Sequence, residues 1–346
     1  MNLGKRVEQR WKAVLFVQRG NDQSDVQGDL SGRGGRVLGA DVIDEVCYPS
    51  AVSQSRGVFV DGSDSLTIEQ ESGILCRAVA AGGAVRIVGI RAEEVAEALA
   101  EAHGLKGDAA RIAAEGVVAA AMMSAHIKGK ERMTLQVQSS SPEMSFFGEV
   151  GSDGAIRGRL KPSVVDAPSR RLSGVLLAIK ATEERELYRG ATPVSDQTLT
   201  EALRGHLSDS VQVDGLLWIE GASGILMERL PDSDGRHQLT IDAFRAQYGH
   251  LEGHRPAALV EALLHGKLGD EDVHLLGVRS LYWSCRCSEE RVLGMLATLG
   301  AQTLGQMIEE DGQAEVTCHF CNRPYTIPVE ALRSLRQRLM EPAGEA

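Results

Sequence analysis

The residues best suited to chemistry are four cysteines near the C-terminus, arranged as two close pairs. One residue separates Cys285 from Cys287, two separate Cys318 from Cys321, and 30 residues lie between the pairs. Four thiolates can bind one zinc ion tetrahedrally, and a closed set of four sulfur ligands leaves no open position for a substrate. The spacing therefore predicts one zinc ion per chain, bound by these four cysteines, and argues against zinc catalysis.

Two roles for this zinc site are compatible with the spacing. The metal could be a plain structural clip for a module that is too small to fold alone. Alternatively the thiols could be redox-active, because a single residue between Cys285 and Cys287 is unusual for a structural site and each pair is close enough to form a local disulfide. Arg286 and Arg323 lie beside the pairs. Positive charge there favours thiolates, although both arginines could equally be solvated surface residues.

Oxidation would have a large effect on such a module. Disulfide formation removes the charge of the thiolates and most of their metal affinity, so zinc would leave. In small modules the apparent free energy of zinc binding, about 10 to 16 kcal/mol, acts as folding free energy. We therefore expect oxidation to unfold the tail.

The sequence around the cysteines predicts the elements that position them. Residues 314–317 and 325–327 are strand-like arms on either side of the second pair, and Asn322 follows Cys321 where a left-handed residue often lies in a zinc-knuckle hairpin. Ser288 is expected to cap a helix that ends at Gly300. A second short helix is expected before Gly312, and the two helices fill the insert between the cysteine pairs.

Upstream, strand and helix patterns predict an α+β fold. Gly82 and Gly83 suit the tight turn of a hairpin, Gly104 is expected to end a helix, and Asp108 is expected to cap the next one. Strands are expected at residues 74–79, 85–90, 133–138, 155–160, 174–181, 211–220 and 224–230, and helices at 92–103, 108–126 and 196–207. Runs of strands with few helices favour a mixed or antiparallel sheet with packed helices over a regular βαβ repeat.

Composition divides the chain into four parts. Residues 1–66 form an N-terminal extension of uncertain order, and its glycine-rich stretch does not match a phosphate-binding motif. Residues 67–231 form the α+β domain, residues 232–272 a helical linker, and residues 273–346 a small C-terminal zinc-binding domain. Cys76 lies in an apolar run and is expected to be buried, whereas Cys47 has no assigned role.

The charge balance disfavours several partners. The chain has 346 residues with 37 basic and 48 acidic side chains, and its net charge of −11 opposes binding to nucleic acid or to anionic membranes. No apolar run approaches the roughly 20 residues of a membrane span, and the N-terminus does not resemble a secretory signal. We therefore expect a soluble, cytoplasmic protein.

The main alternative function is a zinc-ribbon module, structural or nucleic-acid-binding, without redox switching. From Cys285 to Tyr325, six acidic residues oppose three basic ones, which would repel phosphate. A thioredoxin-like oxidoreductase would place its reactive pair at a helix start, whereas Cys318 follows a strand. The serines at 139–141 lack a nucleophile elbow, so no enzymatic activity is expected.

Several motifs are similar to those of one known family. The cysteine pairs occur together with residues 309–312 (EEDG) and 318–322 (CHFCN), and upstream with residues 128–137 (KGKERMTLQV), residues 153–158 (DGAIRG) and the series Tyr188, Gly190 and Pro193. Over residues 72–340 the sequence resembles the redox-regulated heat-shock holdase family, also called the thirty-three-kilodalton chaperonin family. Residues 1–66 lie outside this resemblance, and residues 239–272 match it only weakly.

The resemblance implies a specific function. It implies that residues 67–231 are a chaperone domain, that the linker is metastable, and that the C-terminal domain is a redox switch that is inactive while reduced and zinc-bound. By family analogy, oxidation forms the disulfides Cys285–Cys287 and Cys318–Cys321, releases zinc and unfolds the linker. The exposed surface then captures unfolding client proteins without ATP, and the oxidised form is expected to be a homodimer.

Overall fold

A single large sheet organises the part of the chain that the computed structural model describes, namely residues 73–211, 215–230 and 239–341. Neighbouring strands of this sheet are antiparallel, except that β12 and β5 are parallel. The predicted α+β class with a mixed sheet is therefore confirmed. Within the described residues the sheet has ten strands, in the order β7 (Glu186–Gln197), β6 (Leu172–Ala181), β3 (Arg132–Ser141), β4 (Glu143–Gly151), β5 (Ala155–Lys161), β12 (His274–Trp283), β1 (Gly73–Ala80), β2 (Val85–Arg91), β9 (Ser223–Arg229) and β8 (Gly215–Glu220).

One face of the sheet, here called the helix face, carries the helices α1 (Glu93–His103), α2 (Gly107–Met123) and α3 (Leu199–Asp209). Because side chains alternate along a strand, residues such as Leu75, Leu135 and Phe146 point to this face, where they are at most 1% exposed. Gly116 in α2 lets the helix approach β4, since a Cβ there would lie 2.5 Å from the Phe146 ring. The helix face holds the largest apolar cluster of the described residues.

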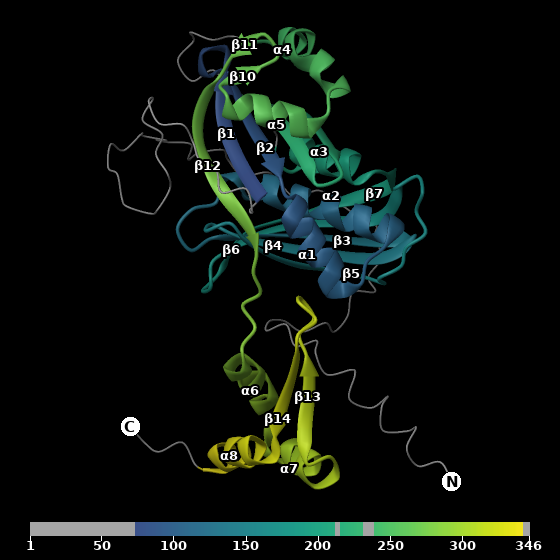
Figure 1. Cartoon of the computed structure of the whole chain (residues 1–346), viewed down its shortest axis with the longest axis vertical. Helices are drawn as coiled ribbons and strands as arrows, with labels where there is room; N and C mark the ends of the chain where they lie inside the picture. Colours follow the sequence, from purple (N-terminus) through teal and green to yellow (C-terminus); the bar gives the residue numbers. More distant parts are fainter. Residues whose placement is uncertain (1–72, 212–214, 231–238, 342–346) are drawn as a thin grey trace, which may run out of the picture. The chain divides into compact units, whose positions relative to one another are not determined.

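The opposite face of the sheet, here called the outer face, is covered over β1, β2 and β9 by the linker segment (Figure 1). There Cys76 lies under α5. Its sulfur and the side chains of Val260 and Leu263 all pack around Gly89 of β2. Burial raises the pKa of the Cys76 thiol to about 12, and the prediction that Cys76 is a buried core residue is confirmed. The segment consists of α4 (Ile241–Tyr248), the 3-10 turn η3 (Gly249–Gly253), α5 (Pro256–Leu264), β10 (Lys267–Leu268) and β11 (Glu271–Asp272).

The cysteine-bearing tail follows β12. It contains a two-stranded antiparallel hairpin and three short helices: α6 (Glu289–Ala297), α7 (Gly300–Glu310), β13 (Gln313–Thr317), β14 (Pro324–Pro328) and α8 (Val329–Met340). The tail buries only a few apolar side chains, among them Leu304 and Leu332 from its helices and Ile327 from β14. The tail therefore has a small core of its own.

Several local predictions are confirmed. The β1–β2 hairpin turns at Gly82 and Gly83, whose φ values are 64° and 101°, and α1 is capped by Gly104 in the left-handed region. Ser288 caps α6 by accepting a hydrogen bond from the Arg291 amide at 3.2 Å. The strands β4 and β7 and the helix α8 were not predicted.

Other expectations differ from the structure. The prediction that Asp108 caps α2 is wrong: the N-cap is Lys106, and Asp108 instead accepts a hydrogen bond from the distant Ala167 amide at 2.9 Å. Residues 274–283, grouped with the tail in the sequence, form β12 of the large sheet. Residues 1–66 and Cys47 lie outside the described residues. Among the described helices, none has the length and apolar character needed to cross a membrane.

Candidate metal centre

The first cysteine pair is positioned directly by the large sheet. Strand β12 pairs with the start of β5, and the Ser284 amide donates to the Ile156 carbonyl at 2.8 Å. Cys285 and Cys287 therefore follow immediately after this backbone hydrogen bond to the sheet, and the capped start of α6 comes after them. The position of this pair is thus determined by the sheet on one side and by the tail on the other.

The second pair lies in the turn between β13 and β14. The Cys318 amide donates to the Arg323 carbonyl at 2.9 Å, and the Asn322 amide donates to the Cys318 carbonyl at 2.8 Å. Asn322 has a φ of 57°, as predicted for the left-handed residue of a knuckle. These bonds close a tight turn that directs both sulfur atoms to the same side.

The structure brings all four predicted cysteines together. Their sulfur atoms lie within 4.8 Å of one another, with Cys285 and Cys318 at 3.6 Å and Cys287 and Cys321 at 3.4 Å. Four sulfurs at about 2.3 Å from a tetrahedral zinc would be separated by about 3.8 Å, so this donor set fits such an ion. Among the described residues, no other group of three or more His, Cys, Asp and Glu side chains lies this close.

Hydrogen bonds at the site favour negative charge on one sulfur, that of Cys318. The pKa of Cys318 lies well below its usual value, because Cys318 accepts a hydrogen bond from Cys285 and from the backbone amides of Cys321 and Phe320. The pKa of Cys285 is raised in return, because it donates that bond and is partly buried. The Tyr325 hydroxyl donates to the Cys287 sulfur at 3.0 Å. A bound cation would replace the shared protons.

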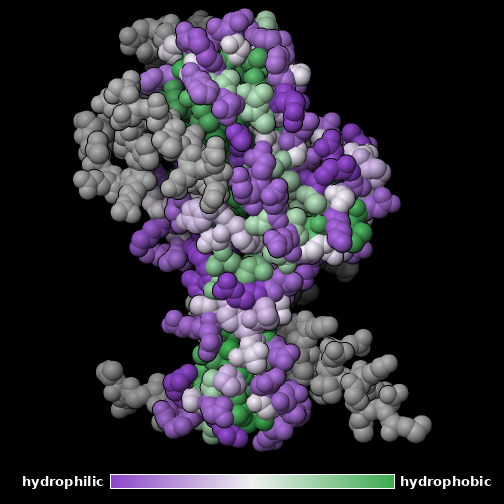
Figure 2. Space-filling view, in the orientation of Figure 1, coloured by the Kyte–Doolittle hydropathy of each residue, from purple (hydrophilic) through white to green (hydrophobic). Residues whose placement is uncertain are grey.

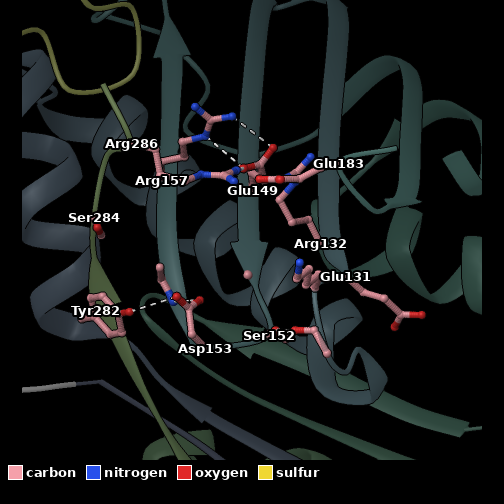
Figure 3. Close-up of a pocket in the computed structure, with 14 residues that line it drawn as sticks. Glu131, Arg132, Glu149, Ser152, Asp153, Arg157, Glu183, Tyr282, Ser284 and Arg286 are labelled. Atoms are coloured by element: carbon pink, nitrogen blue, oxygen red, sulfur yellow. Dashed lines mark hydrogen bonds and ion pairs between the residues drawn. The ribbon is translucent and has the colours of Figure 1, made fainter. Parts of the chain in front are cut away.

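Arg286, between the cysteines of the first pair, has a role that neither sequence interpretation included. Its guanidinium forms an ion pair with Glu149 on β4, which also binds Arg157 at 3.0 and 3.1 Å (Figure 3). Burial alone would raise the pKa of Glu149, but Arg157, Arg286 and Arg132 outweigh it and hold that pKa below its usual value. This carboxylate lines a pocket of about 420 Å³ on the outer face.

Phe320, between the cysteines of the second pair, forms the other contact with the sheet. Its ring centroid lies 5.2 Å from that of Phe147, and the Arg157 guanidinium lies 4.3 Å from its centre. His103 at the end of α1 shares a hydrogen bond with the Phe320 carbonyl at 2.8 Å. The one sequence signal for this contact is an aromatic residue within a cysteine turn, where no core of the tail requires it.

The described residues thus form a sheet domain with a linker segment on its outer face and a tail whose four cysteines are a candidate metal centre. The chain belongs to the Hsp33 family: the family model described as "Hsp33 protein" matches residues 74–328. The family resemblance found in the sequence is thereby confirmed.

Individual relatives agree with this assignment. The chain is 28% identical to the "33 kDa chaperonin" of Gloeobacter violaceus over 77% of this chain and 95% of that protein. It is 25% identical to the protein of the same name from Shouchella clausii, over 75% and 95% respectively. A crystal structure of the 33 kDa chaperonin from Thermotoga maritima has a TM-score of 0.61 at 19% identity, covers 78% of this chain and 98% of that one, and supports the fold.

Proposed function

We propose that this protein is a redox-regulated, ATP-independent chaperone that holds unfolding client proteins. In this proposal the reduced form is zinc-bound and inactive, and oxidation of the four cysteines activates it. The observation that carries the proposal is the close cluster of Cys285, Cys287, Cys318 and Cys321 in a chain of the Hsp33 family. No nucleotide site and no catalytic group is required, so the protein is not proposed to be an enzyme.

Zinc is the metal we assign to the site. Four cysteine sulfurs suit zinc, which accepts four thiolates without redox chemistry of its own. The tail buries few apolar side chains, so its folding depends on the metal. Loss of the ion should therefore unfold α6 to α8 together with the β13–β14 hairpin.

We assign the disulfides Cys285–Cys287 and Cys318–Cys321 to the oxidised form. For each disulfide, two zinc-bound thiolates, one hydrogen peroxide and two protons from solvent give one disulfide and two water molecules. The single zinc ion is released as its ligands are lost. In the reduced structure, sulfur contacts of 3.6 Å and 3.4 Å also run between the pairs, from Cys285 to Cys318 and from Cys287 to Cys321. Peptide mapping of the oxidised protein distinguishes these pairings, and a majority of Cys287–Cys321 linked peptides would contradict the assignment.

Release of the linker would expose the apolar part of the outer face. Side chains such as Ile87, Ile225 and Met227 are fully buried under α4 and α5. On the visible part of the surface in Figure 2, hydrophilic residues predominate and apolar ones form separate patches. A contiguous apolar area uncovered by linker release would bind unfolded chains, with about 25 cal/mol per Å² available before ordering costs.

The remaining assignments follow from the same proposal. The chaperone domain comprises residues 67–231 together with strand β12 at residues 274–283, the linker comprises residues 232–272, and the redox switch comprises the tail that follows β12. The oxidised form is a homodimer, the protein acts in the cytoplasm, and nucleic acid and membranes are not partners. The N-terminal extension, residues 1–66, has no assigned role.

A combined titration tests the proposal. Zinc release is followed with a chromogenic chelator while hydrogen peroxide is added, and light scattering of heat-denaturing citrate synthase is recorded with each sample. We expect protection of the client to rise in parallel with zinc release, and a Cys47→Ser variant to behave like the unmodified chain. Equal protection by reduced and oxidised protein would contradict the switch, and no protection by either would contradict the chaperone function.

A further inference from the structure

The outer face of β4 and β5 presents an aromatic side chain among polar ones. Along β4, Ser145, Phe147 and Glu149 alternate with buried residues, and Phe147 lies opposite Arg159 on β5. The linker helices cover β1, β2 and β9 instead of this part of the sheet. Phe147 therefore has no core to join on this face, and its aromatic contact comes from the tail.

The contact with Phe320 combines a ring–ring contact with two cation–π contacts. The two rings are 5.2 Å apart and tilted by 53°, which is a favourable aromatic arrangement. The Arg157 guanidinium lies 4.3 Å from the Phe320 ring centre and that of Arg159 lies 6.0 Å from it, within the range of a cation–π interaction. Ion pairing of Arg157 with Glu149 holds its guanidinium in this position.

The contacts with Phe320 use only its ring and its main-chain carbonyl, which every aromatic residue of an extended chain possesses. His103 bonds the main-chain carbonyl of Phe320, and Phe147 and Arg157 contact its ring. None of these contacts uses a cysteine or the metal centre. Folded proteins bury most of their aromatic rings, so such a site would select an unfolded chain.

Two hollows beside the site leave room for a polypeptide. The pocket of about 420 Å³ shown in Figure 3 is lined by Glu149 and Arg157. A second pocket of about 1320 Å³ is lined by His103, Met144 and the tail residue Asn322. A chain whose aromatic residue contacted Phe147 could therefore continue in either direction across the outer face.

We propose that Phe147, Arg157 and His103 form a binding site for an aromatic residue of an unfolded client, and that Phe320 of the reduced tail occupies this site as a built-in competitor. The inference rests on the proposed chaperone function and specifies part of the client surface. Because the tail is tethered to β12, its effective concentration at the site is on the order of millimolar. Weakly binding clients are excluded until metal loss unfolds the knuckle that presents Phe320.

Site-specific photocrosslinking in the full-length chain tests this inference. The photoreactive amino acid p-benzoylphenylalanine replaces Phe147, and the same amino acid at Arg189, an exposed residue of the edge strand β7, serves as the control. In the reduced protein we expect the probe at 147 to crosslink to the tail peptide that contains Phe320. In the oxidised protein with heat-unfolded citrate synthase, we expect at least fivefold more client crosslinking at 147 than at 189.

Variants of the competitor separate the site from the redox switch. In the reduced, zinc-bound state, Phe320→Ala should empty the site and increase client crosslinking at 147 at least fivefold, whereas Phe320→Tyr should leave it low. Zinc content should be the same in both variants, because neither changes a ligand. Client crosslinking that does not differ between Phe320→Ala and Phe320→Tyr would overturn the inference.

A second measurement changes Phe147, the residue of the sheet that receives the aromatic ring. Oxidised Phe147→Ala should protect citrate synthase less well than the unmodified chain, with a severalfold higher concentration needed for half protection. Full protection by this variant, together with no client crosslinking in the oxidised chain that carries the probe at 147, would overturn the inference and leave the proposed function intact. Failure of the oxidised unmodified chain to protect the client would overturn both.

Discussion

The two halves of the outer face are covered in different ways. Over β1, β2 and β9 the linker helices form an apolar seal in which Val260, Leu263 and Cys76 are fully buried. Over β4 and β5 the tail makes an ion pair through Arg286 and a ring contact through Phe320. The first half depends on apolar area. Under the proposed function, the second half depends on a small module that needs zinc, so oxidation would act on the second half directly and on the first only through the chain that connects them.

Removal of one zinc ligand should have the largest effect. In Cys318→Ser the metal loses a sulfur, and a tail whose folding draws on about 10 kcal/mol of zinc binding should unfold. Native mass spectrometry should show loss of zinc from the reduced protein, and hydrogen exchange should show loss of protection in α6 to α8. The helices α1 and α2 should keep their protection, because their core contains no part of the tail. Zinc retained at full affinity would contradict this prediction.

Truncation of a buried linker side chain should expose the outer face over β1, β2 and β9 while the metal stays bound. Leu263 is 0% exposed between α5 and the sheet, and a buried Leu→Ala change costs about 2 to 5 kcal/mol. Leu263→Ala should therefore increase the fluorescence of a hydrophobic dye in the reduced protein, with unchanged zinc content. The neighbouring Leu264, which is only partly buried, provides the matched control Leu264→Ala. An equal response of the two variants would show that linker packing does not seal this half.

An added methyl group between linker and sheet should also loosen the linker, but by less than the Leu263→Ala change. A Cβ at Gly89 would lie 2.7 Å from the Cys76 sulfur, 3.0 Å from Val260 and 3.2 Å from Leu263. Overpacking of this kind costs about 1 to 3 kcal/mol, so Gly89→Ala should lower the peroxide concentration needed for activation. The control Gly205→Ala adds a methyl group in α3, where no atom lies within 4 Å. An unchanged peroxide midpoint in Gly89→Ala would count against the seal.

The sequence predicted those parts of the molecule that depend on near neighbours. The cysteine spacing, Asn322 in its turn and the Ser288 cap each involve residues a few positions apart, and the structure confirms their geometry. The pair Gly82 and Gly83 was predictable for the same reason, because only a few residues determine a tight turn.

Long-range contacts could not be predicted in this way. Asp108 has the local signature of a helix cap but bonds Ala167, 59 residues away. Strand β12 reaches β1 across about two hundred residues, and its mostly half-exposed side chains do not alternate clearly. The contact of Phe320 with Phe147 joins a cysteine turn to the outer face of a strand that the sequence did not indicate. Such contacts are set by the packing of the whole fold.

Removal of a single hydrogen bond between the linker and the rest of the domain should have the smallest effect on dye binding. The Tyr248 hydroxyl donates to Glu271 at 2.7 Å, and Glu271 also accepts from the Ala81 amide at 2.9 Å and from Gln247 at 3.2 Å. In Tyr248→Phe the carboxylate keeps two donors, so no buried charge is left without a partner and the cost should be about 1 kcal/mol. Dye binding by the reduced variant should rise slightly, and less than in Leu263→Ala. The matched control is Tyr282→Phe on β12, outside the part of the sheet that the linker covers. The Tyr282 side chain is 41% exposed and its hydroxyl donates to Asp153 at 3.2 Å. This variant should leave dye binding unchanged. A response to Tyr248→Phe as large as that to Leu263→Ala would show that hydrogen bonds, and not apolar area, hold the linker on the sheet.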